Sequence, residues 1–357
     1  MPTSLVTGGT GFIALHVVKI LLDNGHAVHT TVRSLRNVAK CQPLFDLQSQ
    51  YPGRLSLFEA DLLHEGSFGP AMQVCDTVYH IASPFLVPQQ IKNGRKECVE
   101  PALQGTRNVL ESVEKCPSVK RVVLTSSIAA MYGDCSEIPR TQNGALTETY
   151  WNNTSSETNN PYHYAKVVAE REAWRLHDAQ SRWELVVLNP GLTLGPPLTG
   201  ASTSGSLFMI ENIFSGANKM GCPELYYPIV DVRDVAEAHV RAGSQSFSPA
   251  PSSGSGPRCR YLLTAGDRTL SLLEMADILR PSHRDPRLLP TRNLPRLMVY
   301  IAGPFIGVSR HWIAHNLGVR FRVDNRRSVK ELGVVYRPVE QTLKDQYEAW
   351  LRLKHGE

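Results

Sequence analysis

Long apolar runs are absent from this chain of 357 residues. The longest such stretch near its end, Leu297–Val308, is interrupted by Gly303 and Pro304. Because a membrane-spanning helix needs about 20 apolar residues, we expect no membrane span and a packed helix or turn here. The opening residues already read as a strand, which leaves no room for a targeting peptide. We therefore expect a cytoplasmic protein.

The cysteine patterns of metal sites and disulfide frameworks are also missing. None of the seven cysteines forms a Cys-x-x-Cys pair or a zinc-like spacing. An odd, widely spread number predicts free thiols in a reducing compartment, and no bound metal. The formal net charge is +5, and Lys and Arg are scattered. We expect no nucleic-acid partner, although a small anionic ligand could use the excess charge.

Short apolar runs alternate with helical patterns through the first half of the chain. Such alternation predicts an α/β fold of the Rossmann type, a doubly wound parallel sheet covered on both faces. The predicted strands are Ser4–Thr7, Ala27–Val32, Leu55–Glu59, Thr77–Ile81, Arg121–Thr125 and Glu184–Leu188. The predicted helices are Phe12–Asn24, Glu100–Lys115 and Tyr162–Gln180.

The character of the chain changes after residue 190, where Pro, Gly and Ser become frequent and the elements become shorter. We predict a nucleotide-binding domain over residues 1–190. Residues 191–357 then form mainly a small C-terminal substrate-binding lobe, interleaved with the first domain. Whether a strand near 229–232 rejoins the first domain is left open.

A glycine-rich turn follows the first predicted strand. Gly8, Gly11 and Ala14 stand three residues apart and lead into the first predicted helix. Gly8 permits a tight turn, Gly11 lets the backbone approach a pyrophosphate, and Ala14 allows close packing of helix on strand. The helix N-terminus offers unpaired N–H groups to phosphates. Because the pattern lies between a strand and a helix, it predicts a dinucleotide site rather than only a tight turn.

A basic residue follows the second predicted strand, where NAD-binding chains carry an acidic one. Arg33 stands there, with Arg36 and Lys40 downstream. A guanidinium group can hold a ribose 2′-phosphate through two hydrogen bonds, so we predict NADP(H). Asp61 ends the third strand near the expected adenine, and helix capping is its alternative role.

The hexapeptide PYHYAK at 161–166 contains two tyrosines and one lysine. Pro161 suits the first turn of a helix. Tyr162 and Lys166 are four residues apart and share a helix face, whereas Tyr164 lies about 200° round the helix from both. The spacing therefore selects Tyr162 as the partner of Lys166.

Carbonyl reduction requires such a pair. A carbonyl that receives a hydride must also gain a proton, and a phenol is a weak acid at neutral pH. A nearby ammonium group stabilises the phenolate, and it can also hold the nicotinamide ribose. A serine hydroxyl can orient the carbonyl oxygen. Ser126 and Ser127 end the fifth predicted strand, and ligands of open α/β sheets bind at such ends.

Ten segments in order along the chain carry a resemblance to a known family: VTGGTGFIA, TVRS, EADL, HIASP, GTRNVLE, VVLTSS, YHYAK, NPGLTLGPPL, VDVRDVAEAH and DNRRSVKELGV. The chain resembles the extended short-chain dehydrogenase/reductases. Within them it is similar to the dihydroflavonol-reductase-like branch, which includes plant dihydroflavonol and cinnamoyl-CoA reductases and fungal methylglyoxal, aldehyde and ketone reductases.

The resemblance implies a role for each matching position. It makes Ser127, Tyr162 and Lys166 the catalytic triad of a reversible NADPH-dependent carbonyl reductase. The matching cofactor-contacting positions, besides Tyr162 and Lys166, are Gly8, Gly11, Phe12, Ile13, Arg33, Lys40, Asp61, Leu62, Ala82, Thr125, Ser126, Pro190, Gly191 and Leu192.

Two departures separate the chain from the plant members. Tyr132 stands where flavonoid reductases have the Asn that binds the substrate ring, and the Asn-Trp-Tyr-Cys-Tyr signature of cinnamoyl-CoA reductases is missing around Tyr162. These departures argue against both plant substrates, and the segments SETNNPYHY and DNRR are more similar to the fungal reductases. Candidate walls of a substrate pocket, each of which could equally be core, are Phe85, Met131, Tyr132, Phe208 and Tyr226.

Two other classes of function stay open. One is an NAD-dependent sugar-nucleotide epimerase or dehydratase, or a 3β-hydroxysteroid-type dehydrogenase; Arg33 argues against the epimerase. The other is a non-enzymatic redox-sensing module that binds NADP(H) and a partner protein. We expect a small-molecule carbonyl substrate and either a monomer or a homodimer.

Overall fold

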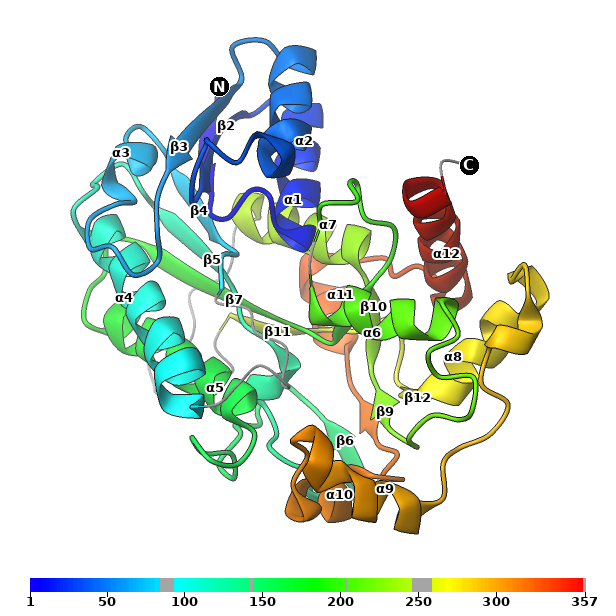
Figure 1. Ribbon diagram of the computed structural model, residues 1–357. Coiled ribbons are helices and arrows are strands. Elements are labelled where there is room, and N and C mark those ends of the chain that lie inside the picture. Colours follow the sequence, from blue (N-terminus) through cyan, green and yellow to red (C-terminus); the bar gives the residue numbers. More distant parts are fainter. Residues whose placement is uncertain (84–92, 141–143, 203, 246–258, 356–357) are drawn as a thin grey trace.

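Seven parallel strands form the central sheet of the computed structural model (Figure 1). The structure describes residues 1–83, 93–140, 144–202, 204–245 and 259–355. Within these residues the strand order is β11-β7-β5-β4-β1-β2-β3, so the winding reverses between β1 and β4. The predicted Rossmann-type fold is therefore confirmed. The strands are β1 (Thr3–Val6), β2 (Ala27–Val32), β3 (Leu55–Glu59), β4 (Thr77–His80), β5 (Arg121–Thr125), β7 (Glu184–Pro190) and β11 (Arg260–Leu263).

Helices cover both faces of this sheet and enclose two separate cores (Figure 1). In α1, Ala14, Val18 and Leu21 recur every three or four residues, so one apolar stripe faces the strands. The first core takes residues from α1 (Phe12–Asp23), α2 (Val38–Gln50), α7 (Val232–Ser244) and α11 (Arg326–Leu332). The second takes residues from α3 (Gly69–Met72), α4 (Glu100–Glu114) and α5 (Pro161–Asp178).

The C-terminal lobe has its own core, around Phe214, Leu279 and Tyr347. Its helices are α6 (Gly205–Phe214), α8 (Leu272–Leu279), α9 (Arg296–Ala302), α10 (Arg310–Asn316) and α12 (Val339–His355). Its strands pair in twos: β8 (Leu192–Leu194) with β10 (Ile229–Asp231), and β9 (Tyr226–Tyr227) with β12 (Leu270–Ser271). A third pair, β6 (Ala145–Leu146) with β13 (Arg322–Val323), joins the lobe to the first half of the chain.

The strands after residue 190 pair differently from the alternative left open by the sequence. The strand near 229–232 pairs with β8 outside the central sheet. The seventh strand is instead β11, which pairs with β7. It was missed because Arg260 puts a charge into a strand of four residues, whereas buried parallel strands usually read as continuous apolar runs. The chain still returns to the first core, because α7 packs on α1.

The apolar stretch at 297–308 forms α9 and the short turn that follows, but its large side chains are not packed. Leu297, Met298, Ile301 and Phe305 are exposed. The expectation of a packed segment is therefore wrong for these side chains. In the described part of the chain, no helix is long and apolar enough to cross a membrane.

Candidate active site

The glycine-rich turn joins β1 to α1 at the carboxyl edge of the sheet. Gly8 has a φ of +72°, a left-handed conformation that favours glycine, and a Cβ there would lie 3.1 Å from the Cβ of Ala82. A Cβ on Gly11 would lie 3.1 Å from the Gly8 carbonyl oxygen. Gly11 caps α1 without a side-chain hydrogen bond, so the first N–H groups of the helix remain available to an anion.

The residues around this turn differ in burial and in the space around them. Phe12 is buried and Ile13 half-buried, so any contact that Phe12 makes with a ligand comes through its backbone. Sequence reasoning missed Gly9, where a Cβ would lie 2.1 Å from the Thr30 hydroxyl oxygen. The repeated glycine in TGGTG was its signal, and its role is to let the turn lie against β2.

The basic residues after β2 differ in exposure. Arg33 and Arg36 are exposed, and neither makes an ion pair with any residue that the structure describes. Lys40 is half-buried in the first turn of α2, where its N–H donates to the Asn37 side chain at 3.2 Å. The Arg33 guanidinium is therefore free to bind a ligand anion.

Asp61 and Leu62 lie in a loop that one buried amide holds against α4. The Asn108 side chain accepts from Gly66 N at 2.9 Å and donates to the carbonyl of Leu62 at 3.2 Å. The exposed Asp61 carboxylate accepts from Leu63 N at 2.8 Å, which is a turn-capping contact. Its other oxygen makes no hydrogen bond to a residue that the structure describes, so capping and adenine binding are compatible.

Two adjoining cavities lie at the carboxyl ends of β4 and β5. The first is lined by Leu62, His80, Ala82, Ser83, Ala102, Gly105, Thr106, Leu124, Thr125, Ser126, Lys166, Ala169 and Glu170. Tyr162 lines the second cavity, together with Lys166 and Ser83. The structure thus brings together residues that the sequence predicted from segments more than 100 positions apart.

Tyr162 and Lys166 share a face of α5, as their spacing indicated. The Lys166 ammonium lies 5.8 Å from the centre of the Tyr162 ring and donates to the Ser83 hydroxyl at 3.1 Å. Tyr162 is 38% exposed. Tyr164 instead packs, half-buried, against the cluster formed by Cys98, Val99, Ala102 and Ala165.

The two serines after β5 point to different partners. Ser127 is half-buried, and its Oγ accepts from Ala129 N at 3.1 Å. Ser126 is buried, and its Oγ donates to the Glu170 carboxylate. The Ser126 hydroxyl therefore points towards Glu170, although the residue lines the first cavity. This leaves Ser127 as the serine whose hydroxyl proton is not committed to a described acceptor.

A buried ion pair between Arg260 and Glu170 lies next to the first cavity, and the sequence did not predict it. Arg260 on β11 donates to Glu170 on α5 at 2.5 Å, and the two side chains are 3% and 0% exposed. Asn189 donates both to Glu170 at 2.8 Å and to the Ser127 carbonyl at 3.0 Å. Glu170 follows Lys166 by four residues, and that repeat on one helix face was the available signal.

Two buried histidines flank the site in neutral form. Burial, and then the charge of Lys166, lower the pKa of His80 to about 3. The Thr7 hydroxyl already accepts from two backbone N–H groups, so it donates to His80 Nδ1 at 3.1 Å. Burial lowers the pKa of His239 to about 4. His239 Nδ1 donates to the Val235 carbonyl, and its Nε2 accepts from the Thr125 hydroxyl.

His239 should make the protein less stable in acid. Its folded-state pKa of about 4 lies below the ordinary 6.5, so the unfolded chain binds the extra proton between these values. Its contribution is therefore full above pH 6.5 and is lost as the pH falls towards 4. The loss is about 2 kcal/mol at pH 5. Urea unfolding of wild type and His239→Gln at pH 7.5 and 5 should show a smaller acid loss in the variant; equal losses would contradict this.

The remaining predicted cofactor positions lie where β7 passes into β8. Pro190 is buried at the end of β7, and Leu192 is half-buried at the start of β8. A Cβ on Gly191 would lie 2.4 Å from the Pro228 carbonyl oxygen. Glycine is therefore required here for packing, independently of any ligand.

The predicted substrate-pocket residues are not gathered around the two cavities. Met131 and Tyr132 are buried in a cluster with Phe321, and Tyr226 lies under the Arg320 guanidinium at 4.6 Å. Phe208 on α6 is exposed. Phe85 lies outside the described residues. None of the four described residues lines either cavity, so their pocket role stays a prediction.

Comparison with protein families identifies one family for most of the chain. The model of the NAD dependent epimerase/dehydratase family matches residues 4–251. That range contains the glycine-rich turn and both cavities. It stops before β11.

One curated relative and one solved structure match nearly the whole chain, and a second relative matches about two thirds of it. Cinnamoyl-CoA reductase CAD2 of Medicago truncatula is 33% identical over 96% of this chain and 94% of that protein. Tetraketide alpha-pyrone reductase 2 of Arabidopsis thaliana is 41% identical over 68% of this chain and 74% of that protein. The crystal structure of Gre2 with NADPH from Candida albicans is 28% identical, with a TM-score of 0.76 over 99% of this chain and 100% of that chain.

Proposed function

The chain belongs to the NAD dependent epimerase/dehydratase family, and on that premise we propose that it is an NADPH-dependent reductase of aldehydes or ketones. The coarser class, a reductase of the extended short-chain dehydrogenase/reductase type, follows from its relatives. The observation that carries the finer proposal is the meeting of Tyr162 and Lys166 at cavities beside the glycine-rich turn.

The residues present fit a dinucleotide. Gly8 and Gly11 leave a concave backbone that a Cβ would fill, and the start of α1 presents free N–H groups there. Ala82 lies against Gly8 and lines the first cavity together with Leu62, Thr125 and Lys166. NADPH bound here would supply the hydride that the carbonyl carbon accepts.

The side chains of the chain itself would manage the proton. Tyr162 is exposed enough to reach a carbonyl oxygen and donate its phenolic proton. Lys166 holds a positive charge beside the ring, which stabilises the phenolate that remains. Ser127 would donate its hydroxyl hydrogen to the same oxygen as negative charge develops. In this structure Lys166 binds Ser83, so it would exchange that contact for the ribose hydroxyls.

A panel of aldehydes and ketones, followed by the absorbance of NADPH and separately of NADH, tests the proposal. We expect oxidation of NADPH by at least one carbonyl. Arg33→Ala should lower kcat/KM for NADPH roughly 10- to 100-fold, because charge-assisted hydrogen bonds to the 2′-phosphate are lost. Its kcat/KM for NADH should change little.

Arg36→Ala is the matched control, since Arg36 is also exposed and lies three residues away, and this variant should keep its preference for NADPH. Clear preference of the wild type for NADH would contradict the role of Arg33. No oxidation of either cofactor across the panel would contradict the reductase proposal and favour the non-enzymatic module.

The alternative of an epimerase or dehydratase rests on the family description alone. Such enzymes recycle a bound NAD, and Arg33 stands where an NAD site has its acidic residue. The relatives named above are reductases, which favours net reduction of a small carbonyl substrate. The predicted cytoplasmic location is supported by seven free cysteines, and the choice between monomer and homodimer stays a prediction.

A further inference from the structure

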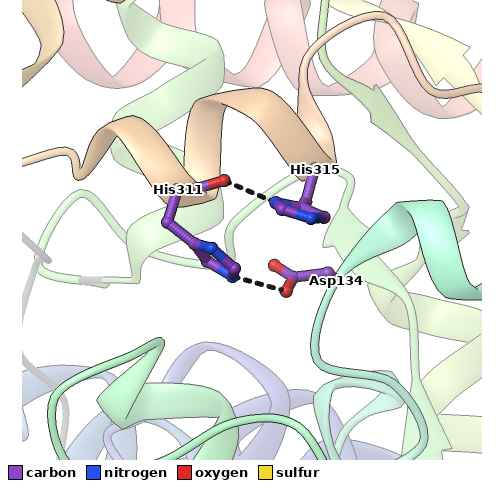
Figure 2. Close-up of side chains that lie close together, drawn as sticks. All are labelled: Asp134, His311 and His315. Atoms are coloured by element: carbon purple, nitrogen blue, oxygen red, sulfur yellow. Dashed lines mark hydrogen bonds and ion pairs between the residues drawn. The ribbon is translucent and has the colours of Figure 1, made fainter.

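Three side chains from two distant segments meet at the edge of the C-terminal lobe (Figure 2). His311 and His315 are four residues apart on α10 and share a face. Asp134 comes from the segment that follows β5. One potential metal-ligating atom from each residue lies within 4.8 Å of the others.

Hydrogen bonds determine which imidazole nitrogen is free in His315. Its Nδ1 lies 2.9 Å from the His311 carbonyl oxygen. A carbonyl only accepts, so Nδ1 carries the hydrogen, and Nε2 of the neutral ring has a free lone pair. Metal-binding histidines usually donate their other N–H to a carbonyl or carboxylate in this way. His311 Nε2 lies 3.4 Å from Asp134 Oδ2, and Figure 2 shows both rings beside that carboxylate.

The Asp134 carboxylate is buried and held in place. Its Oδ1 accepts from the Asn316 amide at 2.7 Å, and Asn316 in turn accepts from Cys135 N at 2.9 Å. The backbone N–H of Asp134 donates to the Glu137 carboxylate at 3.0 Å. The Oδ2 atom is left on the side of the two histidines. The carboxylate is therefore oriented before any ion arrives, and Glu137 adds further negative charge nearby.

We propose that Asp134, His311 and His315 bind a divalent transition-metal ion, with Zn²⁺ the best match. Two imidazoles and one carboxylate are ligands typical of zinc, and three protein ligands leave a fourth position for water. Ligand atoms around tetrahedral zinc lie about 3.4 Å apart; the His311 and Asp134 atoms already have this spacing, and the remaining pairs, within 4.8 Å, would close by no more than about 1.4 Å. His311 can supply that movement, because its side chain is 57% exposed.

The ion would connect the C-terminal lobe to the candidate active site. Asp134 lies seven residues after Ser127. The Tyr132 carbonyl in between accepts from His163 at 3.1 Å, and His163 is next to Tyr162. A metal ion bound by α10 and Asp134 would therefore restrain the segment that follows Ser127. Through the hydrogen bond between Tyr132 and His163, it would also restrain the start of α5, which carries Tyr162.

Cysteine spacing could not indicate this site, and from the sequence we expected no metal. Its ligands are 177 or more residues apart across the two segments, because Asp134 and His311 meet only in the fold. The pair HWIAH was the local signal, since histidines four apart share a helix face.

Titration of metal-free protein with Co²⁺, followed by its visible absorption, tests the proposal, with Zn²⁺ as competitor. We expect one equivalent to bind in the wild type. His311→Ala and His315→Ala should each weaken binding at least tenfold, and both variants should fold because they remove partly exposed rings. His64→Ala, an exposed histidine outside the cluster, should bind like the wild type. Zn²⁺ should raise the Tm of the wild type and of His64→Ala only.

Equal Co²⁺ binding by all four proteins would overturn the site, as would binding abolished by a thiol-blocking reagent, which would assign the metal to cysteines. These measurements read metal binding and Tm rather than turnover. Their failure is therefore distinguishable from failure of the proposed reductase activity.

Discussion

Replacing Tyr162 by phenylalanine should lower turnover about 10²- to 10⁴-fold, the range that general acid catalysis contributes. The variant keeps the ring near Lys166 and removes only the hydroxyl. The substitution lies on the exposed side of α5, so neither core contacts nor the glycine-rich turn should change. NADPH affinity, measured by quenching of protein fluorescence, should therefore stay close to that of the wild type.

Tyr164→Phe is the matched control. Tyr164 lies on the same helix but packs against the cluster around Cys98 and Val99, and its loss of one hydroxyl should leave kcat nearly unchanged. If Tyr162→Phe kept more than a tenth of wild-type turnover, the assigned proton donor would be wrong. If both variants lost activity equally, a structural effect on α5 would be the better explanation.

Arg260→Ala should lower the free energy of unfolding by about 3–5 kcal/mol, as expected when one partner of a buried ion pair is removed. The substitution leaves the buried Glu170 carboxylate without its counter-ion. It also removes the donor to the carbonyl of Glu148 at 2.8 Å and the guanidinium that lies 4.1 Å above the Trp151 ring. Urea unfolding at pH 7.5 measures the loss.

Two further variants test whether burial of the ion pair determines its contribution to stability. Arg241→Ala breaks another Arg–Glu pair, with Glu237, whose side chains are 41% and 37% exposed, and it should change stability little because water screens it. Glu170→Ala combined with Arg260→Ala should cost less than the sum of the two single substitutions. Additive losses, or equal losses for Arg241 and Arg260, would show that burial of the pair does not determine its contribution.

The first half of the fold could be predicted because its signals are local. The bounds of β2, β3 and β5 agree with the sequence, since each is a short apolar or β-branched run between turn residues. The glycine-rich turn and the shared face of Tyr162 and Lys166 follow from spacing of three or four residues. Such patterns need no knowledge of the rest of the chain.

The parts that could not be predicted depend on distant partners. Arg260 is stable inside a strand only because Glu170, 90 positions earlier, neutralises it. Met131 and Tyr132 have apolar surroundings that Phe321 completes from the C-terminal lobe. In both cases the contact that determines the burial joins two distant segments, and neither local sequence indicates that they lie close together.

The late position of β11 also bears on how the chain is made. During synthesis, β7 is complete at Pro190, but its outer neighbour begins only at Arg260. At ordinary translation rates the 69 residues between them take roughly 3–14 s. Through that interval the nascent chain presents β7 as an open edge, available to other chains, while Glu170 has no counter-ion from β11. A chaperone that shields this edge would matter most in those seconds.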